Sequence, residues 1–379
     1  MEEAKEKEER NDMKLICDKT LLSNAVQGVS KAVSQRGGIP VLEGIYMKAE
    51  GFSLTLTGYD LELAITTQIE ANVQEPGEAV LPARLLGDMV RRLPAQEVEI
   101  VSLDSGAATV RGGITEYDIM GLNPGDFPSL PNTGAEPTFD IGAQALREMV
   151  ETTIYAVSVD DKKPAHTGEL LRIEKEKLTI VALDGYRLAI TEKPIAATKD
   201  IDVIVPAKAI SETVKLLGED EQTVHVAANR RFVVFSTTGY TVISRLIEGE
   251  FLDYARVIPE GCKTAVTVDV RDFINVIERA SLIITERLKN PLRIAFGDGS
   301  ITVRCQTALG KVVDELPAKM EGPAMEIGFN NRYLLDALRN SRCDKLRFEL
   351  SGPLSPVKVR PVDGDGFLFL VLPVRFKND

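Results

Sequence analysis

The stretch Leu183-Asp184-Gly185-Tyr186-Arg187-Leu188-Ala189-Ile190 places an Asp-Gly pair between two apolar segments. This pattern predicts a tight hairpin, because glycine takes the positive φ that such a turn demands. A similar stretch, TGYDLELAI, occupies residues 57–65. Its Leu-Ala-Ile triplet begins at position 63 and the later one at position 188, a spacing of 125 residues. The spacing indicates that the chain is built from repeats.

Two more pairs of motifs recur at nearly the same distance. The segment around Pro82 (VLPAR) recurs around Pro206 (IVPAK), and Phe127 of a Pro/Gly-rich hinge recurs as Phe251, each 124 residues further on. A third and weaker copy begins near Ala265. Each unit of about 120 residues reads as a strand, a helix, strands, a second helix and more strands. Two helices per unit against many alternating strands predict an α+β fold in which the helices pack on antiparallel sheets.

The apolar spacing also predicts which side chains the first two helices bury. The first helix is expected to turn Leu21, Leu22, Ala25, Val26, Val29 and Val33 inward, and the second Leu85, Leu86, Met89, Val90 and Leu93. From the repeats we predict a disordered extension at residues 1–12 and three domains at 13–131, 132–258 and 259–379.

Composition limits the class of protein. A chain of 379 residues is too long for one core. No apolar run approaches the roughly 20 residues that span a bilayer, and the charged N-terminus does not resemble a signal peptide. The four cysteines form no CxxC pair, which favours reduced thiols and a cytoplasmic location. The net charge of −12 by itself argues against nucleic acid as a partner.

The motifs nevertheless resemble those of the bacterial DNA polymerase III beta subunits, the sliding clamps, from Met13 to about Phe376. The resemblance rests on Pro82-Ala83-Arg84, Asp126-Phe127-Pro128, Asp184–Ala189, Met325–Asn330 with Tyr333, and Leu372–Arg375. It implies three clamp domains per chain and a head-to-tail homodimer, which closes a six-domain ring around double-stranded DNA without sequence specificity. The dimer contact would join Tyr117 and Ile119 to Leu282 and Ile283. Burial of these four residues in an ordinary core is the alternative.

The resemblance also implies a pocket for short peptides of the replicative polymerase alpha subunit, the clamp loader, other polymerases and repair proteins. Apolar walls suit leucine and phenylalanine anchors. The predicted pocket residues are His166, Leu183, Gly185, Tyr186, Arg187, Leu188, Arg256, Val257, Asn330, Tyr333, Val371, Leu372, Pro373, Val374, Arg375 and Phe376. Leu252 and Tyr186 depart from residues found in the family, departures that could change which peptide is preferred without removing the pocket. A plain C-terminal edge strand is the alternative for 372–376.

Basic residues are the candidates for contact with DNA. Loop positions that match the family are Arg36, Lys162 and Lys163, and helix positions are Arg84, Arg91, Lys208 and Lys215. The same helices carry Asp88 and Glu212, so an ordinary solvated face with paired charges is the alternative. A sliding ring would hold DNA by enclosure, and tight phosphate contacts would stop it.

The sequence gives little support for catalysis. It has no phosphate loop, HExxH or GxSxG motif, and neither His166 nor His225 has a cysteine spaced for zinc. We therefore expect no metal, no cofactor and a subunit that is not itself catalytic. Any DNA-directed DNA polymerase activity would belong to the holoenzyme of which it is an accessory subunit. Asp160-Asp161 leaves open a carboxylate-metal nuclease or transferase. A protein scaffold that never encloses DNA is a third possibility.

Overall fold

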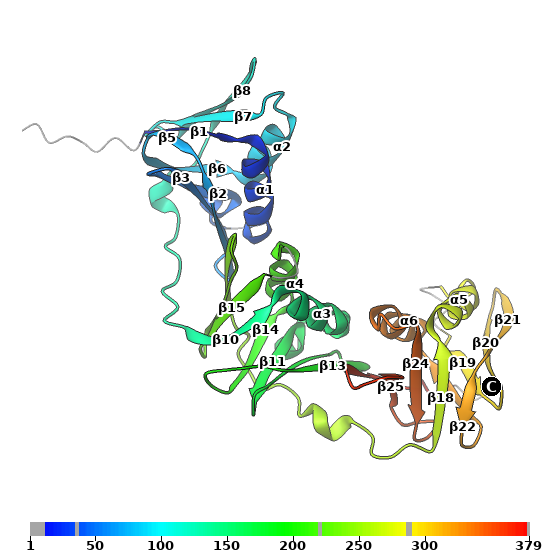
Figure 1. Cartoon of the computed structure of the whole chain (residues 1–379). Coiled ribbons are helices and arrows are strands. Elements are labelled where there is room, and N and C mark those ends of the chain that lie inside the picture. Colours follow the sequence, from blue (N-terminus) through cyan, green and yellow to red (C-terminus); the bar gives the residue numbers. More distant parts are fainter. Residues whose placement is uncertain (1–11, 35–37, 219–221, 286–289, 377–379) are drawn as a thin grey trace, which may run out of the picture. The chain divides into compact units, whose positions relative to one another are not determined.

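The computed structural model describes residues 12–34, 38–218, 222–285 and 290–376 (Figure 1). In these ranges the chain forms six α-helices and four antiparallel sheets. By internal contacts it divides into two compact units. One runs up to Ala143 and includes Glu212–Arg245; the other combines Gln144–Ser211 with Leu246 onward.

Two sheets belong to the first unit. The five-stranded sheet has the order β5 (Asn72–Glu75), β1 (Met13–Asp18), β7 (Glu97–Ser102), β8 (Ala107–Gly112), β9 (Thr115–Met120). The eight-stranded sheet has the order β10 (Glu136–Gly142), β15 (Thr223–Ala228), β16 (Phe232–Ser236), β17 (Tyr240–Arg245), β4 (Leu63–Glu70), β3 (Ser53–Tyr59), β2 (Gly44–Glu50), β6 (Gly77–Pro82). Because β17 pairs with β4, strands of the first and second repeats share one sheet.

The helices of the first repeat, α1 (Lys19–Val29) and α2 (Ala83–Arg92), pack against each other. Asp18 caps α1 by accepting the N–H groups of Thr20 and Leu21. Two burial predictions were wrong here, since Leu21 and Leu85 are 45% and 44% exposed. Each precedes a buried residue, and the rotation of about 100° between helix neighbours turns it away from the core.

The end of α1 also differs from the prediction. The helix stops at Val29 and a 3₁₀ turn follows over Ser30–Ala32, so the buried Val33 lies beyond the helix. In the repeated stretch 57–65, β4 begins only at Leu63. Asp60 accepts the N–H groups of Glu62 and Leu63, and Leu61 has a φ of +77°, which together form a turn before β4.

The second unit also contains two sheets. The nine-stranded sheet has the order β14 (Ile201–Pro206), β11 (Gly168–Glu174), β12 (Lys177–Leu183), β13 (Arg187–Pro194), β26 (Phe367–Val371), β25 (Val357–Pro361), β24 (Lys345–Leu350), β18 (Thr264–Asp269), β22 (Lys319–Glu321). The four-stranded sheet has the order β21 (Gly310–Pro317), β20 (Ser300–Thr307), β19 (Leu292–Phe296), β23 (Met325–Phe329). Strands of the second and third repeats share the larger sheet through β13 and β26.

The helices of the third repeat lie side by side next to β18 and β24 (Figure 1). They are α5 (Val270–Ser281) and α6 (Asn331–Asn340). Their buried faces meet an aromatic core in which Phe273 contacts Phe348 edge to face at 5.6 Å between ring centroids. The second repeat has the corresponding helices α3 (Ala143–Thr153) and α4 (Ala207–Leu216), each directly after a strand. The predicted α+β plan, with two helices in each repeat, is therefore confirmed.

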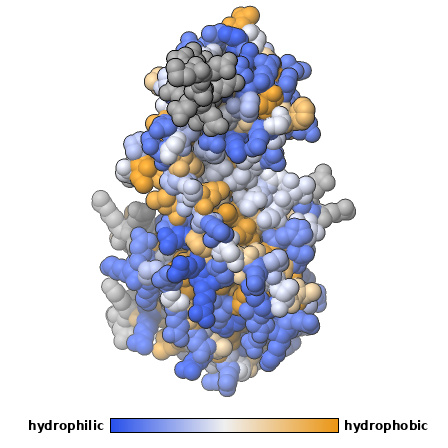
Figure 2. All heavy atoms as spheres, turned by 90° about the vertical axis from the view of Figure 1, so that its left-hand side faces the viewer, coloured by the Kyte–Doolittle hydropathy of each residue, from blue (hydrophilic) through white to orange (hydrophobic). Residues whose placement is uncertain are grey.

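Several remaining predictions concern the ends, thiols and surface of the chain. Most of the predicted extension lies outside the described residues, but Asp12 accepts the N–H of Asp104 at 3.1 Å. All four cysteines are free; Cys17 and Cys305 are buried, whereas Cys262 is exposed. Hydrophilic residues predominate on the face shown in Figure 2, with hydrophobic residues in small groups between them. Within the described ranges no helix is long and apolar enough to cross a membrane.

Candidate functional site

The turn between β12 and β13 is held by its own side chains. Asp184 Oδ1 accepts the N–H of Tyr186 at 2.8 Å and that of Arg187 at 3.1 Å, which closes an Asx turn. Gly185 has a φ of +89°, a conformation that a residue with a Cβ rarely adopts. The predicted hairpin is present, and it presents Tyr186 with 60% of its surface exposed.

Arg187 connects this turn to α6, the second helix of the third repeat. Its Nε donates to Asp184 Oδ2 at 3.0 Å, and its guanidinium also pairs with Asp336 of α6. The same group lies 4.9 Å from the ring centre of Tyr333 and 5.4 Å from that of Tyr155. Because its side chain is only 12% exposed, the charge is compensated by carboxylates and aromatic faces in place of water.

Tyr186 and Tyr333 form a stacked pair at the edge of this cluster, with ring centroids 5.7 Å apart and planes 18° apart. The geometry is that of offset aromatic packing. Tyr186 is 60% exposed, whereas the ring of Tyr333 is half-buried and is also in contact with the Arg187 guanidinium.

The C-terminal segment 372–376 crosses from the nine-stranded to the four-stranded sheet. Leu372 donates its N–H to the Tyr186 carbonyl at 2.9 Å, and Val374 donates to the Gly328 carbonyl at 2.8 Å. Phe376 then lies under Arg293, 4.2 Å from ring centre to guanidinium. The segment is thus fixed at both ends instead of continuing β26 as a plain edge strand.

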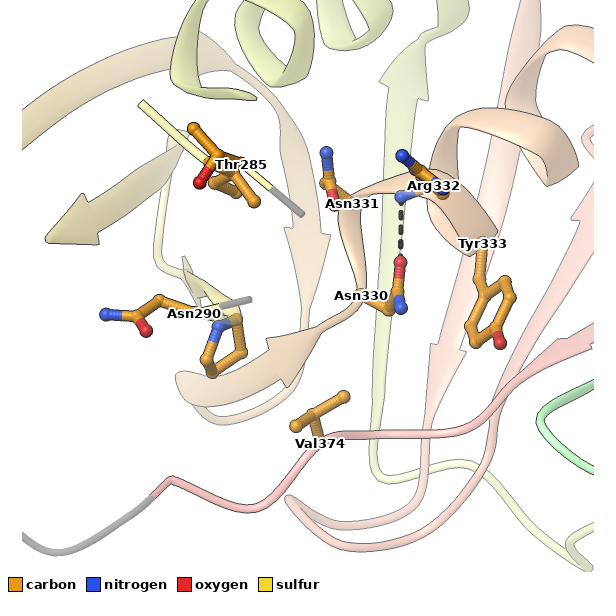
Figure 3. A pocket seen from close by; sticks show the side chains of 9 residues that line it. Thr285, Asn290, Asn330, Asn331, Arg332, Tyr333 and Val374 are labelled. Atoms are coloured by element: carbon orange, nitrogen blue, oxygen red, sulfur yellow. Dashed lines mark hydrogen bonds between the residues drawn. The ribbon is translucent and has the colours of Figure 1, made fainter. Parts of the chain in front are cut away.

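A cavity of about 710 Å³ opens beside this segment at the start of α6 (Figure 3). Asn330 caps α6 by accepting the N–H of Arg332 at 3.0 Å. Three of the predicted pocket residues, Asn330, Tyr333 and Val374, line this cavity. Sequence reasoning missed its other lining residues, which are Ile284, Thr285, Asn290, Pro291, Asn331 and Arg332. An Asn-Pro turn signal at 290–291 and an Asn-Asn helix start at 330–331 could have pointed to them.

Other predicted pocket residues lie in the core beneath the surface. Leu183 and Leu188 are cross-strand partners and belong to a buried cluster with Leu370 and Phe251. Val371 is also fully buried, in the core of the third repeat. Because these residues are buried, they can pack beneath a pocket but cannot form its exposed walls.

The remaining predicted pocket residues are near the surface. His166 packs edge to face on Phe251, its Nδ1 has no partner among the described residues, and burial followed by the charge of Lys163 lowers its pKa. Arg256 is exposed and pairs with Asp253 at 2.8 Å, while Val257 is 40% exposed. Pro373 is half-buried, and Arg375 is exposed.

Six of the seven predicted DNA-binding cations lie among the described residues and are exposed, and at least two of them, Arg91 and Lys215, have acidic partners. Arg91 and Arg92 both donate to Asp88, and these hydrogen bonds lower the pKa of that carboxyl. Lys215 pairs with Glu212 at 2.8 Å. Arg84, Lys162, Lys163 and Lys208 are also exposed. Arg36 lies outside the described residues.

The four predicted interface residues lie in two places. Two are on β9, an edge strand among the described residues, and two directly follow α5. Tyr117 and Ile119 are half-buried on β9, which has one neighbour, β8, among the described strands. Leu282 follows α5 and is 81% exposed. Ile283 is partly buried against the core of the third repeat. The structure thus leaves at least Leu282 outside the core of its own chain.

The acidic pair at 160–161 belongs to an ordinary loop. Asp160 Oδ1 accepts the N–H of Lys162 at 3.1 Å, which is a local turn contact. Among the described residues no three His, Cys, Asp or Glu side chains gather in a way that could hold a metal ion. His225 is exposed and hydrogen-bonds to Asp140 through Nδ1 at 2.8 Å.

Comparison with known proteins accounts for nearly the whole chain. Residues 13–131, 140–253 and 255–375 match, in order, the N-terminal, central and C-terminal domains of the DNA polymerase III beta subunit. A beta sliding clamp of Halalkalibacterium halodurans is 32% identical over 96% of this chain and 100% of its own. One from Staphylococcus aureus is 29% identical over 91% and 94%. The chain belongs to the DNA polymerase III beta-subunit family, the beta sliding clamps.

Solved structures agree with this assignment. The sliding clamp from Bacillus subtilis superposes with a TM-score of 0.92 at 29% identity, covering 96% of this chain and 100% of that one. A clamp from Pseudomonas aeruginosa bound to griselimycin gives a TM-score of 0.90 at 29% identity, with the same coverage. The resemblance that the motifs predicted is therefore confirmed.

Proposed function

We propose that two copies of this chain close head to tail into a ring that encircles duplex DNA and tethers the replicative polymerase. The observation that carries the proposal is the match of three consecutive clamp domains along the full repeat array. A ring holds DNA by topology, so a net charge of −12 is compatible with this function. We keep the domain boundaries 13–131, 132–258 and 259–379 as part of the proposal.

The dimer contact would use β9 of one copy and the edge of the four-stranded sheet, β21, of the other. Each of these strands has a single neighbour among the described strands, so its outer hydrogen-bonding groups are available. Tyr117 and Ile119 would meet Leu282 and Ile283 alongside this pairing. A heterologous contact of this kind gives a ring when the rotation closes.

The inner surface would contact DNA weakly. Arg91 and Lys215 are held by acidic neighbours, which lowers the gain from a phosphate contact. Few counterions would then be released, and the affinity of each contact would be low. Arg36, Lys162 and Lys163 stay as the proposed loop contacts, together with Arg84 and Lys208 on the helices.

Short peptides of the polymerase alpha subunit, the clamp loader, other polymerases and repair proteins would bind at the turn 184–187 and the segment 372–376. The exposed Tyr186, stacked on the half-buried Tyr333, and the cavity beside Val374 offer apolar surface, and Asn330 adds a polar group at its edge. We propose a non-catalytic, cofactor-free role in the cytoplasm. Neither the carboxylate-metal enzyme nor the scaffold that never encloses DNA is favoured by a specific observation.

Fluorescence anisotropy tests the pocket. A labelled peptide that carries a Gln-Leu-x-Leu-Phe motif is titrated with the intact chain and with a chain lacking residues 372–379. We expect saturable micromolar binding that the truncation abolishes, with far-ultraviolet circular dichroism as the control for folding. Binding by both folded chains would move the site away from the C-terminus.

Retention on closed circular DNA tests the ring. A clamp loaded on a circle should stay bound at high salt until the circle is cut, whereas a scaffold would dissociate from both forms alike. Metal-dependent degradation of the DNA that is lost in Asp160→Asn would instead favour the enzyme.

A further inference from the structure

Two successive cross-strand pairs of apolar side chains, called rungs below, join β13 to β26 on one face of the nine-stranded sheet. Leu188 is the cross-strand partner of Leu370, and Ile190 is the partner of Leu368. The four side chains belong to the same apolar cluster and therefore share a face. Since strands rise about 3.3 Å per residue, the rungs lie about 7 Å apart.

The first rung lies under the proposed peptide pocket, and the second continues into a separate hollow. That hollow has a volume of about 320 Å³, and its apolar lining comes from Ile190, Leu368, Phe367, Tyr254 and Ile258. Tyr254 belongs to the 3₁₀ helix Tyr254–Val257, which also carries Val257 of the proposed pocket. The two sites therefore share a sheet face and one covering segment.

The polar rim of the hollow already has its partners. Glu192 accepts from Lys177 at 2.9 Å, and Arg360 donates to Asp365 at 2.5 Å. An incoming charged side chain would compete with these exposed ion pairs, at a small cost in free energy. An apolar one would leave them intact and displace water from Ile190, Leu368 and their neighbours. The hollow therefore selects an apolar side chain.

We propose that this hollow is an extension subsite that binds an apolar residue flanking the anchor motif of the partner peptide. The inference rests on the proposed peptide-binding function and adds a second specificity determinant to it. A spacing of about 7 Å corresponds to two residues of an extended peptide, so the flanking residue lies two positions beyond the one over the Leu188 rung. The volume accommodates one leucine-sized side chain.

Matched peptides test this proposal. The core motif peptide is compared with peptides extended by three residues at either end, carrying Leu or Ser at the second added position. On the wild-type chain we expect Leu at one end to lower the Kd about 5- to 20-fold relative to Ser. Ile258→Glu should abolish that gain and leave the Kd of the core peptide within about twofold. Leu309→Glu, at an exposed position outside the hollow, should keep the gain.

The outcomes separate the subsite from the pocket. Equal Kd values for the Leu and Ser peptides at both ends, with normal binding of the core peptide, would overturn the subsite alone. Failure of the core peptide to bind would overturn the pocket and the subsite with it. If Ile258→Glu unfolds, photo-crosslinking decides: a photo-leucine at the flanking position should label Tyr254, Ile258 or Leu368 in the wild-type chain. Labelling elsewhere would refute the proposal.

Discussion

A buried acid in the middle repeat gives a quantitative prediction about stability and pH. Glu169 of β11 has no exposed surface, and its Oε1 lies 2.6 Å from the hydroxyl oxygen of Thr153. That hydroxyl also lies 3.0 Å from the Met149 carbonyl and 3.2 Å from the Val150 carbonyl. One hydroxyl proton cannot serve three acceptors, so a protonated Glu169 supplies the proton that the arrangement lacks.

Burial raises the pKa of Glu169 from its usual 4.5 to about 8, and the hydrogen bond with Thr153 opposes only part of this shift. Between these two values the unfolded chain is ionised at this position and the folded chain is not. The folded state therefore binds one more proton, and the free energy of unfolding falls by about 1.4 kcal/mol per pH unit as pH rises. The loss accumulates to roughly 4 to 5 kcal/mol near pH 8 and then levels off.

Glu169→Gln removes this titration while keeping the size of the side chain. We expect the variant and the wild type to differ little at pH 5. From pH 5 to pH 8 the free energy of unfolding of the variant should rise relative to that of the wild type by about 1.4 kcal/mol per pH unit. Denaturant unfolding from pH 5 to 9, with hydrogen exchange on β11 amides to identify the transition, measures the difference. Glu174→Gln, exposed on the same strand, is the control and should parallel the wild type.

A difference between Glu169→Gln and wild type that does not change with pH would refute the reasoning. It would mean that Glu169 is ionised in the folded chain or that its titration is not linked to unfolding.

Substitutions at three other positions should change peptide affinity, stability and oligomeric state, respectively. Gly328→Ala would place a methyl carbon 2.4 Å from the Val374 carbonyl oxygen, so the C-terminal segment must shift; we expect peptide affinity to fall at least about tenfold in the anisotropy assay. Arg187→Ala would leave Asp184 without its cation and should lower the free energy of unfolding by about 2 to 4 kcal/mol in a denaturant titration. Leu282→Asp should convert the proposed dimer to monomers in sedimentation velocity, and a sedimentation coefficient equal to that of a dimeric wild type would contradict the proposed interface.

Local chemistry explains why some elements could be predicted from the sequence. The turn at Asp184-Gly185 is formed by neighbours in the chain, because the carboxylate caps N–H groups two and three residues on. Helical spacing likewise identified α2, since a face that repeats every three or four residues must meet a core. The repeat distance of about 125 residues gave the number of domains, because each copy carries the same order of elements.

Burial on the edge of a helix face was less predictable. Leu21 and Leu85 are as apolar as their buried neighbours, but the width of each helix interface depends on what packs against it. Leu22 and Leu86 are fully buried one position later. A sequence pattern predicts which side of a helix is buried. How far the buried face extends around the helix depends on the elements that pack against it.

Only some residues of the candidate site were predicted by resemblance, and their arrangement depends on contacts between distant parts of the chain. Arg187 meets Asp336, which is 149 residues away, and β13 pairs with β26 near the end of the chain. Asn290, Pro291 and Thr285 line the cavity beside Val374, and the Asn-Pro turn signal at 290–291 marks a turn without showing that this turn lies next to the C-terminal segment.

The sequence by itself determined the repeats, the α+β class, the Asp-Gly turn and the family, because each is encoded in short-range spacing or in motifs. Only the tertiary structure decided which repeats share a sheet, which charges are paired and where the C-terminal segment is fixed. Strand pairing and ion pairing depend on distances in space, and residues such as Val374 and Gly328, 46 positions apart, become neighbours only when the sheets form. The same holds for Glu169, whose pKa is raised by complete burial beside Thr153.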